Sequence, residues 1–243
     1  MGVCAICSPY IVGHKTRSGL CSRILWTFWF APLRQTCGTI EQVWLGDWGS
    51  EKTLERQDRI EIVALVGSTR EQSYNRGLLL TAMLLQPDDV HIVEFPVQSL
   101  PFFNPDHADA EQLPTVQDYR EALRRADGVL VCTPEYAYSI PGVLKNALDW
   151  ASTPKGRSPL RGKPVGIASA SIDRTGTVRA QMHLRQVFQS MHAITIPEPE
   201  VYITFAEDKF NALGELTDQT GRDHIRLLVE KLADWALLLR DQR

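Results

Sequence analysis

From residue 60 onward, short apolar segments alternate with segments of helical character, and this order constrains the fold more than any other feature of the chain. The predicted strands are Ile60–Val66, Val90–Phe95, Gly128–Cys132, Lys163–Ala170 and Ala193–Ile196. The predicted helices are Tyr74–Leu85, Val116–Ala126, Pro141–Ala151, Val178–Met191 and Gly221–Arg240. Several strands are nearly continuous in apolar residues, as is typical of strands with both faces covered. The alternation predicts an α/β fold with a doubly wound, five-stranded parallel sheet of the flavodoxin-like type.

The first 59 residues differ from the rest of the chain. They hold four of the five cysteines and four of the six tryptophans, and the first 40 residues contain no acidic residue. No helical or strand period runs through them. We therefore predict an irregular or disordered extension at residues 1–59, followed by one folded domain at residues 60–243. An acid-poor, basic leader is also a property of organellar transit peptides, so organellar targeting is the alternative interpretation.

Composition excludes several classes of protein. The net charge of −3 and the pI of about 6.1 argue against a nucleic-acid-binding surface. No apolar run approaches the roughly 18 residues that span a bilayer, so no membrane segment is predicted. Only Cys132 lies beyond the first 40 residues, which favours a reducing compartment and a cytoplasmic location. The N-terminal cysteines lack the second close pair of a zinc site, so no metal is predicted; they are Cys4, Cys7, Cys21 and Cys37.

The polar loop Gly67–Asn75 directly follows the first strand and has the composition of a phosphate-binding loop. Gly67 lets the chain turn sharply, and the following helix directs the positive end of its dipole at an anion. Its hydroxyl, amide and guanidinium donors are Ser68, Thr69, Arg70, Ser73 and Asn75. Neither Gly-x-Gly-x-x-Gly nor a P-loop signature is present. The alternative is a helix N-cap with an incidental arginine.

A second polar loop, Thr133–Gly142, follows the strand Gly128–Cys132. Its opening Thr-Pro-Glu-Tyr continues neither a strand nor a helix, so it must form a shaped turn. Exposed amides there can bind the polar edge of a planar ring, and Tyr136 adds a flat apolar face. The alternative is a structural turn packed on the sheet. In an open parallel sheet both loops lie at the edge where ligands bind, which indicates a phosphorylated, planar cofactor.

The two loops and one later helix carry a recognisable pattern. It comprises Gly67-Ser68-x-Arg70-x-x-Ser73-x-Asn75, Pro134-Glu135-Tyr136-x-x-Ser139-x-Pro141-Gly142-x-x-Lys145-Asn146-Ala147-x-Asp149-Trp150, and Arg179-Ala180-Gln181-x-His183-Leu184-Arg185-Gln186. Over about residues 60–240 the chain resembles the NADPH-dependent FMN reductase family, and the last segment is similar to its chromate, quinone and azo-dye reductase branch. The resemblance implies bound FMN, NADPH or NADH as co-substrate, and a homodimer or homotetramer with the flavin near the subunit interface.

The resemblance also implies a set of cofactor-binding residues. The phosphate would be held by Ser68, Arg70, Ser73 and Asn75; the ring would be lined by Pro134, Glu135, Tyr136 and Ala137 with Ser139 nearby; and the third side would be closed by Ser169, Ala170 and Ser171. Many relatives have Asn where Ala137 stands, so only a backbone contact is expected there. Relatives often have Gly-Gly where this chain has Gly176-Thr177, a difference in the loop that covers the ring.

The expected activity is a two-electron, ping-pong transfer from NAD(P)H through FMN to a small oxidised acceptor: a quinone, an azo dye, chromate or free flavin. The alternative is a non-catalytic flavodoxin-like electron carrier or redox-sensing FMN-binding protein, although such carriers usually have a Thr-Gly-rich phosphate loop and a strongly acidic surface. No catalytic residue is assigned, because hydride chemistry belongs to the flavin. His183 is expected to be structural or interfacial, and Cys132 to be a small core residue.

Assembly is expected to involve the charged residues near the predicted flavin edge. The sequence shows no evident partner for them within the chain; they are Lys145, Asp149, Arg179 and Arg185.

Overall fold

The computed structural model describes residues 59–106, 113–153 and 156–240, so the predicted extension lies almost wholly outside the described residues. The strands are β1 (Ile60–Val66), β2 (Val90–Phe95), β3 (Gly128–Cys132), β4 (Pro164–Ala170), β5 (Ile194–Thr195) and β6 (Val201–Ile203). The α-helices are α1 (Tyr74–Leu84), α2 (Pro114–Arg125), α3 (Gly142–Ser152), α4 (Val178–Ser190) and α5 (Gln219–Arg240). Two 3₁₀ turns, η2 (Val97–Ser99) and η4 (Ala206–Asp208), complete the order. Predicted helix ends are correct to within two residues.

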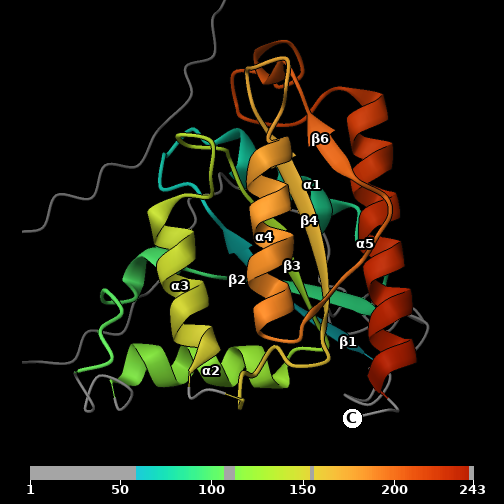
Figure 1. The fold of residues 1–243 in the computed structure, drawn as a ribbon. Coiled ribbons are helices and arrows are strands. Elements are labelled where there is room, and N and C mark those ends of the chain that lie inside the picture. The colour runs from blue at the N-terminus through green and yellow to red at the C-terminus, as the bar shows by residue number, and fades with distance from the viewer. Residues whose placement is uncertain (1–58, 107–112, 154–155, 241–243) are drawn as a thin grey trace, which may run out of the picture. The chain divides into compact units, whose positions relative to one another are not determined.

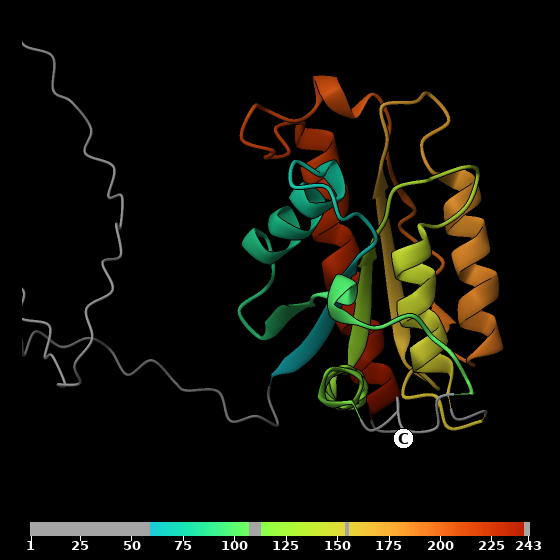
Figure 2. The same cartoon turned by 90° about the vertical axis from the view of Figure 1, so that its left-hand side faces the viewer.

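All strand pairs are parallel, and the main path through the sheet is β2-β1-β3-β4-β5 (Figure 1). This is the flavodoxin-like order that the sequence predicts. Helices α1 and α5 contribute to the core on one face of the sheet, and α2, α3 and α4 to the core on the other. Figure 2 shows this layering edge-on, with α1 on one side and α3 and α4 on the other.

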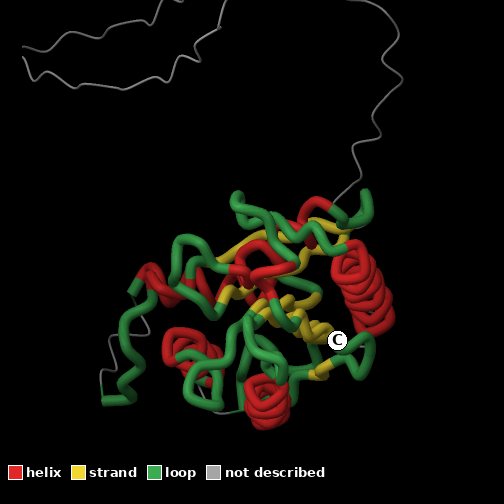
Figure 3. Tube along the Cα trace, turned by 90° about the horizontal axis from the view of Figure 1, so that it is seen from above, coloured by secondary structure: helices red, strands yellow, loops and turns green. Residues whose placement is uncertain are grey.

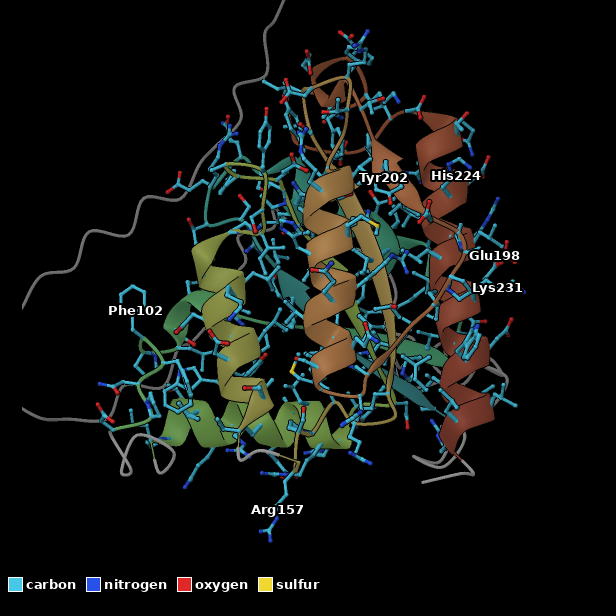
Figure 4. All side chains as sticks on the ribbon, in the orientation of Figure 1. Phe102, Arg157, Glu198, Tyr202, His224 and Lys231 are labelled. Carbon is cyan, nitrogen blue, oxygen red and sulfur yellow. The ribbon has the colours of Figure 1, made fainter. Side chains whose placement is uncertain are left out.

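The predicted strand count of five is wrong by one, because the strand beside β4 is divided. β5 pairs with the first residues of β4, and β6 pairs with the last residues of the same strand. The segment between them includes Pro197 and Pro199, which have no N–H to donate to a ladder. Glu198 of this segment and Tyr202 of β6 are labelled in Figure 4.

The carboxyl ends of the strands carry the polar loops that the sequence singles out. Viewed from that end, the loops lie across the top of the sheet (Figure 3). Among the described residues, no helix is both long and apolar enough to span a membrane.

Candidate functional site

The loops after β1 and β3 lie against each other. Gly67 N–H donates to the Cys132 carbonyl at 2.9 Å, and a Cβ at residue 67 would stand 2.5 Å from Thr133 Oγ1. A glycine is therefore required for the two loops to approach this closely. Farther out, Ser68 Oγ and the Tyr136 hydroxyl are 3.5 Å apart. The fold thus brings the predicted phosphate loop and the predicted ring loop to one edge of the sheet.

The first loop leads into an uncapped helix N-terminus. Ser73 is the N-cap residue of α1, with extended backbone and no side-chain cap. The N–H groups of Tyr74, Asn75 and Arg76 have no acceptor among the described residues, since the first bond of the helix is Gly77 N–H to Ser73 O. Arg70 is exposed and lines the same surface pocket as Tyr74 and Arg76. Free N–H groups, a helix dipole and a guanidinium together fit a phosphate.

Asn75 has a role that the sequence did not reveal. Its buried side-chain amide donates to the Ala170 carbonyl at 3.0 Å and accepts from Ala170 N–H at 2.9 Å. These bonds join the start of α1 to the end of β4. The side chain therefore fixes the start of α1 against the end of β4 and is itself buried, which leaves the backbone N–H of Asn75 for an anion.

The segment predicted as a third loop is mostly strand, because Ser169 and Ala170 are the last residues of β4 and only Ser171 follows it. It is held from within the protein. Ser169 is fully buried; its hydroxyl donates to the Val201 carbonyl at 3.2 Å and accepts from Gln181 Nε2 at 2.6 Å. Ser171 lies nearer the surface, and its Oγ accepts from Asp173 N–H at 3.1 Å. Its own N–H donates to the Ile203 carbonyl at 2.9 Å. Ser171 shapes the loop that follows β4, whereas Ser169 is buried within β4 itself, with neither backbone nor side chain exposed to a ligand.

The second loop contains a two-residue turn. Tyr136 and Ser139 exchange backbone hydrogen bonds of 2.9 Å in both directions, and the residues between them, Ala137 and Tyr138, have φ of 46° and 65°. Two consecutive left-handed residues are typical of a type I′ turn, which favours Asn or Gly. The N–H groups of Glu135, Ala137 and Tyr138 have no acceptor within the described parts of the chain.

These free donors fit the carbonyl and ring-nitrogen edge of a flavin. The Tyr136 side chain is 46% exposed and Tyr138 is 68% exposed, so both aromatic residues are open to a ligand or solvent. Pro134 is buried, and its carbonyl accepts from the Thr133 hydroxyl at 3.0 Å. The turn is thus anchored from β3 and presents unpaired amides beside exposed rings.

Contacts from α4 hold the second loop, and the sequence did not predict them. Arg179 Nε donates to Glu135 Oε1 at 2.5 Å, and Ala180 N–H donates to Oε2 at 3.1 Å. The Arg179 guanidinium also lies 4.0 Å from the centre of the Tyr138 ring. One turn farther, His183 Nδ1 lies 3.0 Å from Ser139 Oγ. The spacing of Arg179 and His183, four residues on a predicted helix, was the signal that could have revealed a shared face.

The premise of the charge argument for assembly is wrong. All four charged side chains that suggested an interface have partners in the same chain. Lys145 pairs with Asp149 at 2.6 Å, and Arg179 pairs with Glu135. Arg185 lies 3.5 Å from Glu200 and donates to the Ile196 carbonyl at 3.2 Å.

Cys132 is a core residue, as predicted. Its side chain is 1% exposed, and burial raises the pKa of its thiol to about 12. The thiol is therefore protonated at neutral pH and unsuited to nucleophilic chemistry. No group of three or more potential metal ligands occurs among the described residues, and the N-terminal cysteines lie outside them.

Comparison with known proteins identifies the family. The model of the NADPH-dependent FMN reductase family matches residues 60–208. An NAD(P)H-dependent FMN reductase of Pseudomonas aeruginosa is 40% identical over 183 residues, covering 75% of this chain and 98% of the relative. A 2-hydroxy-1,4-benzoquinone reductase of a Burkholderia species is 36% identical over 184 residues, covering 76% and 98%.

Solved structures agree with the sequence relatives. The flavoenzyme FerB of Paracoccus denitrificans, an NAD(P)H:(acceptor) oxidoreductase, superposes with a TM-score of 0.67 at 28% identity, covering 74% of this chain and 98% of that chain. Fold, sequence pattern and the arrangement of the loops lead to the same assignment: this chain belongs to the NADPH-dependent FMN reductase family.

Proposed function

We propose that this protein is an FMN-dependent NAD(P)H oxidoreductase whose acceptor is a quinone. The observation that carries the proposal is that two segments with unpaired backbone donors lie against each other. The free N–H groups at the start of α1 lie in one loop and those of Glu135, Ala137 and Tyr138 in another, and the loops meet where Ser68 faces Tyr136. A phosphate and a flat polar ring joined by a short chain match this arrangement.

The residues divide the binding of FMN between them. Ser68, Arg70 and Ser73 would hold the phosphate together with the N–H groups that begin α1. The second loop would bind the ring through its backbone, which explains why Ala137 can stand where relatives often have Asn. When bound, FMN supplies the two-electron chemistry that links a nicotinamide to an acceptor. The protein contributes position and electrostatics.

We also propose that the reaction is ping-pong. Tyr136 and Tyr138 are open to solvent, so the nicotinamide and the acceptor can use one face of the site in turn. Quinones are preferred as acceptors because relatives at 36–37% identity are named quinone reductases, among them the Burkholderia enzyme and a Solanum tuberosum NAD(P)H:quinone oxidoreductase. Azo dyes, chromate and free flavin are secondary acceptors in this proposal.

An anaerobic two-step experiment tests the function. FMN-loaded protein is mixed with NADPH or NADH in a stopped-flow instrument, and the flavin absorbance is expected to bleach within seconds. Addition of a benzoquinone should then restore the oxidised spectrum without nicotinamide present. Failure to bleach with either nucleotide would favour the carrier or sensor alternative. Bleaching without reoxidation by quinone would refute the acceptor assignment alone.

The proposal extends to assembly and location. With the charge argument removed, a homodimer or homotetramer rests on the resemblance to the family, and light scattering of residues 59–243 at micromolar concentration tests it. A monomer mass would reject it. We also propose a cytoplasmic location, with targeting by residues 1–59 as the alternative, and expect fluorescent fusions with and without that segment to decide.

A further inference from the structure

We infer that Arg179 is a positioning residue for flavin binding, and that α4 holds the ring-binding loop in its binding conformation. The inference rests on the proposed function, because it concerns the loop that would bind the flavin ring. It adds a residue outside the expected cofactor contacts and assigns it a role through Glu135 and Tyr138.

Glu135 is the first anchor. Its carboxylate is 6% exposed and lies at the N-terminal end of α4, where it accepts from Arg179 and from Ala180 N–H. A carboxylate in this place is stabilised by the helix dipole and by the guanidinium together. Since Glu135 precedes the turn directly, this bond fixes where the turn leaves β3.

Tyr138 is the second anchor. It occupies the left-handed region, where a residue with a side chain is strained, and it is 68% exposed. The Arg179 guanidinium lies 4.0 Å from its ring centre, in the range of a cation–π contact. The same side chain therefore contacts the residue before the strained turn and one of its two central residues.

His183 adds a third contact on the same helical face. Its Nδ1 lies 3.0 Å from Ser139 Oγ, at the point where the turn closes. The free N–H groups of Glu135, Ala137 and Tyr138 are thus framed by three contacts with one helix. Because these donors are already ordered, binding of the flavin does not include the entropic cost of ordering the turn.

The test compares FMN with riboflavin, which lacks the phosphate. Arg179→Met keeps an unbranched, flexible side chain but removes the guanidinium, and with it the contacts to Glu135 and to the Tyr138 ring. It is expected to raise the dissociation constants of FMN and riboflavin by the same factor, tenfold or more. Arg179→Lys, which keeps the charge and loses the planar fork, should fall in between. The visible spectrum of bound FMN should shift in Arg179→Met, because the ring environment changes. Arg226→Met is the matched control, since Arg226 pairs with Asp223 on α5; it should leave both constants unchanged.

A double-mutant cycle on the apoprotein gives a readout that needs no flavin. Thermal melts of Glu135→Gln, Arg179→Met and the double variant should show coupling, with the double variant more stable than the sum of the single effects implies. If Arg179→Met does not fold, Arg179→Lys and Tyr138→Leu carry the flavin comparison.

Several outcomes would overturn the inference. Wild-type affinity in Arg179→Met would do so, and so would weaker binding of FMN alone, which would place the arginine at the phosphate. Additive effects of Glu135→Gln and Arg179→Met on the stability of the apoprotein would also refute the inference, because they would show that the two side chains do not act together. If the wild-type protein binds neither FMN nor riboflavin, the proposed function is refuted instead. The double-mutant cycle on the apoprotein then still tests whether Arg179 and Glu135 stabilise each other.

Discussion

Gly77 lies inside α1, where replacement of glycine by alanine ordinarily stabilises a helix by about 1 kcal/mol. We expect the opposite here. A Cβ at residue 77 would lie 2.3 Å from the Gly214 carbonyl oxygen and 2.8 Å from Cε1 of Phe210. The first is a backbone atom, so the substitution must displace the loop around Gly214. Overpacking of this kind costs about 1–3 kcal/mol, and two close contacts favour the upper value.

The net destabilisation of Gly77→Ala is therefore about 2 kcal/mol. For a domain of this size, that corresponds to a fall in Tm of about 4–8 °C. The assay is thermal unfolding of the apoprotein, because bound flavin would shift Tm by mass action. Gly142→Ala is the control: Gly142 is the first residue of α3, and its Cβ would meet nothing within 4 Å. It should leave Tm unchanged or slightly raised. A Tm of Gly77→Ala equal to or above wild type would refute the reasoning.

Four further predictions follow from the loops, the core and the extension. Arg70→Ala should weaken the binding of FMN by about 10- to 150-fold, as expected for a charge-assisted contact of about 1.5–3 kcal/mol. A fluorescence titration should show unchanged binding of riboflavin, and equal losses of affinity for both flavins would show that Arg70 does not bind the phosphate. Ala137→Gly should raise the stability of the apoprotein by about 1 kcal/mol in urea melts, because φ is 46° there, and a loss would show that the turn is unstrained. Burial raises the pKa of the Cys132 thiol from 9.0 to about 12. Its contribution to the free energy of unfolding is therefore complete below pH 9 and lost as pH rises toward 12. Urea melts at pH 8 and 10.5 should show a larger fall in the free energy of unfolding for wild type than for Cys132→Ala. Removal of residues 1–58, which keeps the Arg59 carbonyl that Arg240 contacts, should change kcat/KM by less than about tenfold, or about 1.4 kcal/mol; a larger loss would make the extension functional.

The fold could be predicted because its signal is local. Each strand and helix of the main order shows its own apolar pattern, and a parallel sheet places the loops after β1 and β3 at one edge. β6 was missed because three residues, Val201–Ile203, after two prolines carry too little pattern to stand out.

The roles within the site were harder to predict, because they depend on contacts between distant segments. Asn75 reads as a phosphate ligand in its own loop, yet its amide binds Ala170, 95 residues later. From the sequence, Glu135 is predicted to line the flavin ring, yet its carboxylate points toward α4 and binds Arg179. In each case the partner of the side chain is set by tertiary structure, which lies beyond the local sequence pattern.

The division between β5 and β6 has a consequence for contact between copies of the chain. An edge strand with free N–H and C=O groups can recruit a strand from another molecule, and natural proteins blunt such edges with short strands, prolines and charges. Beside β4 the edge strands have only two and three residues. They are separated by five residues, Ile196, Pro197, Glu198, Pro199 and Glu200. This edge is therefore poorly suited to continuing the sheet into a second molecule.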